Sequence, residues 1–149
     1  MQTFLPYPDF KLSASVLDRH RLGKQRVECM QIMRILKGQP SRWVNHPAVQ
    51  MWKGYEGSLL CYTKAICCEW VHVRGYRDTC MEKTSEAFFG EPVDRTRGWQ
   101  APPPHWLGNK DFHARHRSKL LAKNPDHYNQ FGWVEIPGMP YLWPTKLIL

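Results

Sequence analysis

The stretch PAVQMWKGYEGSLLCYTKAICCEWVHV, Pro47–Val73, decides the fold expected for this 149-residue chain. Apolar or aromatic side chains recur along it at steps of three and four residues, which is the period of one helix face. They are Ala48, Trp52, Tyr55, Leu59, Tyr62, Ile66, Trp70 and Val73. Pro47 suits the first position of a helix, and Gly75 suits the position just beyond its end. The pattern predicts one continuous helix of about 28 residues, long enough to be the spine of a small domain.

A first helix is expected before this spine. Ser13 and Ser15 are both suited to cap its N-terminus, and Gly38 suits the position after its last residue, near Lys37. Residues 1–12 contain two prolines, which oppose helix formation. We therefore expect an extended N-terminal segment that leads into the helix.

Two further helices are expected after the spine. One runs from Asp78 or Thr79 to about Phe89, and the other covers Lys110–Lys123 with Asn109 as its N-cap. The connection over 90–105 contains three consecutive prolines and is expected to be a loop, and the proline-rich tail is expected to be extended. The sequence therefore predicts an all-α, compact single domain over residues 1–149. It would have three to four helices, with a long central helix and extended N- and C-terminal segments.

The charge composition limits the classes of function. The chain has 21 Lys and Arg against 13 Asp and Glu, a net charge of +8, which attracts polyanions such as nucleic acid. No apolar run approaches the roughly 18 residues that a membrane span needs. The N-terminus lacks the basic and apolar regions of a secretory signal, and an odd number of cysteines without a signal favours reduced thiols. We expect a cytoplasmic monomer that does not bind a membrane.

The stretch LDRHRLGKQRVE, Leu17–Glu28, concentrates basic residues on the first helix. At about 100° per residue, Arg19 and Arg26 fall in the apolar sector, the side expected to be buried. The outward side carries His20, Arg21, Lys24, Glu28 and Gln31. A buried arginine needs a partner. That partner is either a carboxylate of another helix, such as Glu56 or Glu69, or a phosphate in a polar cleft at the helix end. Outward arginines and lysines either contact phosphates or form a solvated face.

Three parts of the sequence resemble the pyrimidine-dimer DNA glycosylase family, the phage endonuclease V-like enzymes. They are Leu17–Glu28, then Asn45-His46-Pro47 with the aromatic stretch up to Arg74-Gly75-Tyr76 and Asp78-Thr79, and finally Asn124–Tyr128 followed by Phe131-Gly132. The resemblance implies an all-α fold that binds double-stranded DNA. It also implies a DNA glycosylase with associated AP lyase activity, acting on damaged or modified pyrimidines.

The resemblance further implies a chemistry in two steps. An N-terminal α-amine attacks C1′ of the damaged nucleotide and the base leaves, and the resulting imine allows β-elimination at the 3′ phosphate. The pKa of an α-amino group is ordinarily about 8, so part of it is neutral and nucleophilic near pH 7. A glutamate of the first helix supports the sugar chemistry, and arginines hold the DNA. We expect no cofactor and no bound metal.

On this basis, the catalytic candidates are Met1, His20, Arg26 and Glu28. The candidates for DNA binding are Arg19, Arg21, Lys24, Gln25, His46, Arg115 and Arg117.

Two positions depart from the family pattern. The family's catalytic glutamate directly follows the arginine that matches Arg26, but here that position is Val27. Glu28 comes one residue later and points about 160° away from Arg26 on a regular helix. In the family, a small second residue carries the amine after the methionine is removed. Residue 2 is Gln here, so Met1 would keep the amine, and Lys24 is a second candidate for forming the imine.

Several histidines and cysteines allow more than one interpretation. His46, before Pro47, is either a helix cap or a ligand to phosphate. A zinc site is one interpretation of Cys61, Cys67, Cys68 and His72, but zinc ligands usually come from two segments, which favours buried thiols. A second DNA contact or a solvated face is indicated by His105, His113 and His116 with Arg115 and Arg117.

Two other functions stay open at the level of sequence. One is a non-catalytic DNA-binding module on the same scaffold, which Val27 favours. The other is an enzyme that acts on a nucleotide-like phosphate compound. A deep, enclosed pocket too narrow for duplex DNA would indicate the second of these.

Overall fold

The computed structural model describes residues 1–91 and 99–144, and that part of the chain contains seven α-helices and no strand. The helices are α1 (Phe10–Val16), α2 (Arg19–Leu36), α3 (Pro47–Gln50), α4 (Glu56–Cys68), α5 (Cys80–Phe89), α6 (Lys110–Lys123) and α7 (Pro125–Tyr128). A π-helical turn, η1 (Glu69–Val73), continues α4, and a 3₁₀ turn, η2 (Asn129–Phe131), follows α7. The all-α prediction is confirmed, whereas the expected number of three to four helices is too low.

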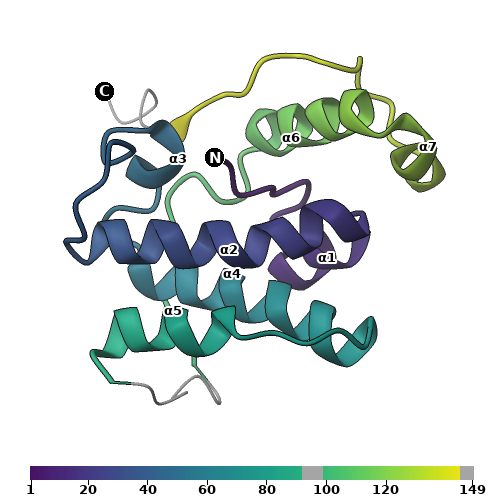
Figure 1. Ribbon diagram of the computed structural model, residues 1–149. Helices are drawn as coiled ribbons and strands as arrows, with labels where there is room; N and C mark the ends of the chain where they lie inside the picture. The colour runs from purple at the N-terminus through teal and green to yellow at the C-terminus, as the bar shows by residue number, and fades with distance from the viewer. Residues whose placement is uncertain (92–98, 145–149) are drawn as a thin grey trace.

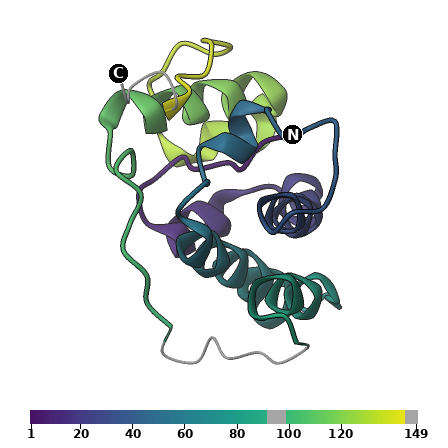
Figure 2. The ribbon, with the colours of Figure 1, turned by 90° about the vertical axis from the view of Figure 1, so that its left-hand side faces the viewer.

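The helices form two groups. α2, α4 and α5 pack against one another, and α6 and α7 lie on the opposite side of the molecule (Figure 1). The extended N-terminal segment runs between the two groups, as both views show (Figure 1 and Figure 2). None of the described helices is long and apolar enough to cross a membrane.

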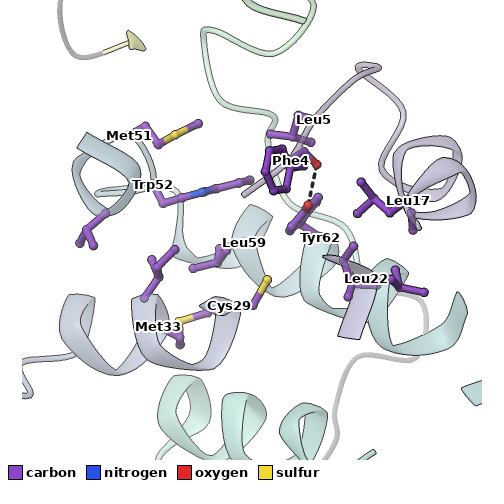
Figure 3. Packing of buried hydrophobic residues seen from close by; sticks show 14 of the residues in the cluster. Phe4, Leu5, Leu17, Leu22, Cys29, Met33, Met51, Trp52, Leu59 and Tyr62 are labelled. Carbon is purple, nitrogen blue, oxygen red and sulfur yellow. Dashed lines mark hydrogen bonds between the residues drawn. The ribbon is translucent and has the colours of Figure 1, made fainter. Parts of the chain in front are cut away.

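One hydrophobic core joins α1–α4 and the N-terminal segment to α6 and α7. Trp52 and Tyr62 are fully buried at its centre, beside Leu5, Leu22 and Met33 (Figure 3). Large aromatic side chains remove much apolar area from water, which makes them effective core residues. The N-terminal segment is therefore part of the core and not a loose lead-in.

The continuous helix predicted over Pro47–Val73 is wrong. The chain leaves the helical path between α3 and α4, where Gly54 has a φ of +84°. Such a backbone conformation is accessible to glycine and unfavourable for other residues. The apolar spacing continues across the break, because the residues before and after it both face the core.

The helix predicted from Ser13 or Ser15 to Lys37 is also divided. Asp9 caps α1 by accepting a hydrogen bond from the Leu12 N–H at 2.9 Å. The backbone is extended at Leu17 and Asp18, and α2 begins at Arg19. The chain therefore turns between two helices where the sequence predicted one.

After residue 73, capping and helix-ending residues predict the helices more accurately than the apolar spacing does before it. α5 ends before Gly90, which has a φ of +80°, and α6 covers the predicted range with Asn109 accepting from the Phe112 N–H at 3.0 Å. In the loop expected over 90–105, residues 92–98 lie outside the described part of the chain. The tail is non-helical as expected over 132–143, and the Gly138 N–H donates to the Ser118 carbonyl of α6 at 3.0 Å.

Candidate active site at the N-terminus

Two histidines of α6 hold the N-terminal segment by its backbone. The Leu5 N–H donates to Nδ1 of His116 at 2.9 Å, and the Leu5 carbonyl lies 2.8 Å from Nδ1 of His113. Burial lowers the pKa of His116 to about 3, so its ring is neutral near pH 7 and can accept this hydrogen bond. Both rings are buried, so the expectation that they belong to a DNA contact or a solvated face is wrong.

Gln25 of α2 holds the same segment from the other side. Its Oε1 accepts hydrogen bonds from the Phe4 N–H and the Tyr62 hydroxyl, both at 2.9 Å. Its Nε2 donates to the Gln2 carbonyl at 2.8 Å. Gln25 was expected to contact DNA, but it is 1% exposed and its amide is bonded within the chain. Gln25 therefore fixes the N-terminal segment to α2 through hydrogen bonds to its backbone.

The Glu28 carboxylate lies beside the beginning of the chain. Its Oε2 accepts hydrogen bonds from the Gln2 N–H at 3.0 Å and from Nε2 of Gln25 at 3.1 Å. The side chain is buried, so the expectation that Glu28 faces outward is wrong. The angular projection assumed one buried side for this helix. α2 in fact buries two, because it packs on α4 and α5 with one side and on the N-terminal segment with the other.

A cavity of about 280 Å³ opens next to Met1 and Glu28. Its lining consists of Met1, Gln2, Phe4, His20, Arg21, Lys24, Gln25, Glu28, Lys123 and Tyr141. Three of these side chains are cationic and one is anionic, so the mouth attracts phosphate while a carboxylate lies inside. Six residues predicted for the site therefore meet at one cavity, namely Met1, His20, Arg21, Lys24, Gln25 and Glu28.

Gln2, Lys123 and Tyr141 are cavity residues that sequence reasoning missed. Lys123 ends α6, and Tyr141 belongs to the tail, more than 100 residues from Met1. Burial raises the pKa of Tyr141 to about 12, so its hydroxyl is protonated near neutral pH. Gln2 reaches the cavity as the neighbour of Met1, whereas no local pattern marks Lys123 or Tyr141, because only the path of the chain brings these two to the cavity.

His46 lies at the N-terminus of α3 and close to the same site. Its Nδ1 accepts a hydrogen bond from the Ala48 N–H at 3.0 Å, so the helix-cap interpretation is confirmed. Burial and the positive charge of the N-terminal amine lower its pKa, while the charge of Glu28 opposes that change. The charges of the N-terminal amine and of the Glu28 carboxylate therefore both act on His46.

Arg26 lies on another face of α2. Its guanidinium donates to Oδ1 of Asp78 at 2.7 Å and lies 4.4 Å from the centre of the Trp70 ring. Asp78 also accepts hydrogen bonds from the N–H groups of Cys80 and Met81 at the start of α5. Burial alone would raise the pKa of Asp78, but the hydrogen bonds from Met81 and Arg26 bring it below its ordinary value. The partner of Arg26 is thus a carboxylate, as one alternative held, although neither Glu56 nor Glu69 provides it.

The other arginines of α2 lie near its first turn. Arg19 was expected on the buried side but is exposed, with its guanidinium 5.4 Å from the centre of the Tyr76 ring. The helix begins only at Arg19, so its side chain points past the end of the core. Arg21 lines the cavity and pairs with Asp18 at 3.3 Å.

Arg115 and Arg117 of α6 contact other parts of the chain. Arg115 donates to the Pro140 carbonyl at 2.8 Å. Arg117 donates to the Pro6 carbonyl at 2.8 Å and forms an ion pair with Glu135. These bonds attach the tail and the N-terminal segment to α6, and contact of either arginine with DNA stays a prediction.

The cysteines do not gather into a metal site in the described residues. Cys67 is buried, and burial raises its pKa well above the ordinary range, as expected for an inert thiol. Cys61 and Cys68 are half-buried, and His72 is exposed. Within residues 1–91 and 99–144, no three His, Cys, Asp or Glu side chains are placed to hold a metal ion.

Comparison with known proteins gives one match. The family model described as pyrimidine dimer DNA glycosylase matches residues 1–84. The match covers more than half of the 149 residues and includes Met1, Glu28 and His46. No curated protein and no solved structure matches the chain.

Proposed function

The chain belongs to the pyrimidine dimer DNA glycosylase family, and on that premise we propose that it excises damaged or modified pyrimidines from duplex DNA and then cleaves the strand as an AP lyase. One observation carries the proposal. The Glu28 carboxylate accepts a hydrogen bond from the Gln2 N–H at 3.0 Å, in the cavity that Met1 lines. An amine and a carboxylate are the two groups that this chemistry needs.

In the proposed reaction, the Met1 amine attacks C1′ of the damaged nucleotide. The C1′–N bond breaks, and the base leaves with the bonding electrons and takes up a proton. Positive charge develops on the sugar in the transition state, and a carboxylate in a partly buried site stabilises such charge. Glu28 is the carboxylate that lines the cavity, and its second proposed role is to take the proton that the amine loses.

The second step starts from the sugar bound to the amine. Opening of the sugar ring gives a protonated imine between C1′ and the Met1 nitrogen. Removal of a proton from C2′ then expels the 3′ phosphate, and water releases the amine from the imine. The proposed roles of Arg21 and Lys24 are to hold the phosphates beside the damaged nucleotide, since both line the cavity mouth. His20 lines the same mouth and is proposed to contact the DNA strand.

The geometry favours this proposal over the two alternatives. A non-catalytic module was favoured by Val27 at the position of the family glutamate, but Glu28 supplies a carboxylate at the N-terminus. An enzyme for a small phosphate compound would need a deep pocket with groups that bind phosphate. The cavity of about 820 Å³ beside α1 and α4 has a mostly apolar surface, whereas the cavity at Met1, about 280 Å³, has three cationic side chains that suit a strand passing over it.

The experiment combines ultraviolet-irradiated duplex DNA with the full-length protein, with and without borohydride. The proposal predicts strand breaks without borohydride and a covalent protein–DNA adduct with it, because reduction converts the imine to a stable amine. The same duplex without irradiation is the control. The proposal fails if neither irradiated duplex nor duplex with an abasic site gives a break or an adduct.

A further inference from the structure

Gln2 is buried at the cavity that its neighbour Met1 lines, and it is 7% exposed. Of its four polar groups, three have partners within the chain. The backbone N–H donates to Oε2 of Glu28 at 3.0 Å, and the carbonyl accepts from Nε2 of Gln25 at 2.8 Å. The side-chain Oε1 accepts from the Thr3 N–H at 2.8 Å. These bonds fix both the backbone and the side chain of Gln2.

The fourth polar group of Gln2 is the side-chain amide nitrogen, Nε2. It is shielded from solvent and makes no hydrogen bond to any residue of 1–91 or 99–144. The Thr3 N–H needs an oxygen as its acceptor, so the amide is oriented with Oε1 towards Thr3 and Nε2 as its free end. Buried donors in native proteins are nearly always hydrogen-bonded. A buried donor without a partner beside a cavity therefore indicates that a ligand supplies the acceptor.

The other groups at the cavity indicate which part of a DNA strand this acceptor belongs to. Lys24 and Lys123 are exposed and Arg21 is half-buried, so phosphates meet positive charge at the mouth. Gln2 is uncharged and more buried than these three residues. Phosphates are bound most strongly by charged donors, whereas an uncharged donor suits an uncharged oxygen. The acceptor of Nε2 is therefore expected in the sugar.

Deoxyribose has one such oxygen next to the atom that Met1 attacks. C1′ is bonded to the ring oxygen O4′, whereas O3′ and O5′ are esterified to phosphates. When the ring opens, the nitrogen lone pair forms the C=N bond of the imine, the C1′–O4′ bond breaks, and its electron pair goes to O4′. O4′ then takes up the proton that Glu28 accepted from the amine in the proposed reaction. Negative charge gathers on O4′ during this step, and a hydrogen-bond donor stabilises such charge.

We propose that Nε2 of Gln2 donates a hydrogen bond to O4′ of the deoxyribose that Met1 attacks, and thereby assists the opening of the sugar ring. The proposal rests on the proposed function and adds a catalytic residue to it. The family pattern has a small residue at position 2, whereas this chain has a glutamine. The proposed contact gives this glutamine a role while Met1 carries the amine.

The test compares the affinity of the full-length protein for two duplexes that differ at one position of a sugar ring. One carries a tetrahydrofuran residue, which is an abasic sugar that retains O4′. The other carries the cyclopentane analogue, in which CH₂ replaces O4′. Neither has a leaving group at C1′, so binding is measured without reaction. We expect the protein to bind the tetrahydrofuran duplex about 3- to 10-fold more tightly, the contribution of one hydrogen bond between uncharged groups.

Two substitutions of Gln2 should abolish this preference. Gln2→Glu retains an oxygen for the Thr3 N–H, but near pH 8 its ionised carboxylate has no proton to donate. Gln2→Met has a side chain of similar length without a donor. Both side chains are as large as that of glutamine, so Met1 should stay in place, and mass spectrometry of the intact protein verifies this. Gln31→Met, on the exposed side of α2, is the matched control and should keep the preference.

A further variant separates Gln2 from its neighbour Tyr141. Burial raises the pKa of Tyr141 and the Gln2 side chain opposes that rise, so the two groups lie near each other, although Nε2 and the hydroxyl are not within hydrogen-bond geometry. Tyr141→Phe should keep the preference for the tetrahydrofuran duplex.

Three results would overturn the proposal. They are equal binding of the two duplexes by the unaltered protein, retention of the preference in Gln2→Glu, and loss of the preference in Tyr141→Phe. Each of them leaves the proposed function standing, provided that both duplexes bind more tightly than undamaged DNA. Binding of both no tighter than undamaged DNA would overturn the proposed function, and this proposal with it.

Discussion

The carboxylate of Glu28 and the backbone N–H of Gln2 are joined by a hydrogen bond of 3.0 Å across 26 residues of sequence. The bond brings the acidic group of α2 to the beginning of the chain. It also explains how the chain can lack a glutamate directly after Arg26 and still present a carboxylate to the N-terminus. The side of α2 that faces the N-terminal segment carries Gln25 and Glu28, while Arg26 faces α5.

Glu28→Gln is expected to lower the rate of base excision by about 10²- to 10⁴-fold, the usual contribution of a group that transfers a proton or stabilises charge. The amide keeps an oxygen that can accept from the Gln2 N–H, so the fold should be retained. Single-turnover excision from irradiated duplex measures the effect. The matched control is Glu82→Gln on the exposed side of α5, which should excise at the normal rate. A Glu28→Gln variant as fast as the unaltered protein would remove Glu28 from the mechanism.

Gln25→Leu is expected to lower both stability and activity. It removes the partners of the Phe4 N–H and the Gln2 carbonyl, and buried polar groups left without partners cost about 1–3 kcal/mol each. Urea unfolding measures the free energy of unfolding, and excision is then compared where the variant is folded. Gln31→Leu makes the same change on the exposed side of α2 and should be nearly neutral. A Gln25→Leu variant with an unchanged free energy of unfolding would contradict the claim that Gln25 holds the N-terminal segment in place.

Arg26→Gln separates a structural role from a catalytic one. The change leaves Asp78, whose side chain is 4% exposed, without its cationic partner, and we expect a loss of about 2 kcal/mol in the free energy of unfolding. If Arg26 acts only through this ion pair, the excision rate of the folded variant stays within about threefold of normal, well below a catalytic effect. A loss of 100-fold or more with unchanged stability would instead assign Arg26 to catalysis.

The buried His116 predicts a pH dependence of stability. Its pKa is about 3 in the folded protein, against an ordinary value of 6.5 for a histidine side chain in water. Below pH 6.5 the unfolded state therefore binds more protons, and stability falls as the pH falls towards 3, by up to about 1.4 kcal/mol per pH unit for this group. His116→Asn retains an acceptor for the Leu5 N–H but cannot titrate. Urea unfolding at several values between about pH 4 and 7 should show a shallower slope for the variant. Equal slopes would contradict the prediction.

Local sequence signals predicted the later helices because each signal acts within a few residues. Asn109 caps α6, and Gly90 ends α5 in the left-handed conformation. The continuous helix predicted over Pro47–Val73 was wrong at Gly54 for a physical reason. The period of apolar residues records which side faces the core, not whether the backbone stays helical between them. A glycine is compatible with a helix and with a turn, so the presence of Gly54 alone did not show whether the helix continues there.

The candidate site was predicted in part. Met1, Glu28 and Lys24 were proposed from the sequence, and the structure brings them to one cavity. The direction of Glu28 was wrong because a helix covered on two sides has no single apolar stripe. Tyr141 and the two histidines that hold Leu5 could not be predicted, since their roles depend on contacts more than 100 residues apart.

The most direct test of the central claim locates the covalent bond to DNA. The protein is trapped on irradiated duplex with borohydride, digested, and the modified peptide is identified by mass spectrometry. The account predicts that the adduct is on the α-nitrogen of Met1, and that the Lys24→Arg variant gives the same adduct in similar yield. An adduct on the Lys24 side chain, or on any other side chain, would contradict the claim that the N-terminal amine is the nucleophile.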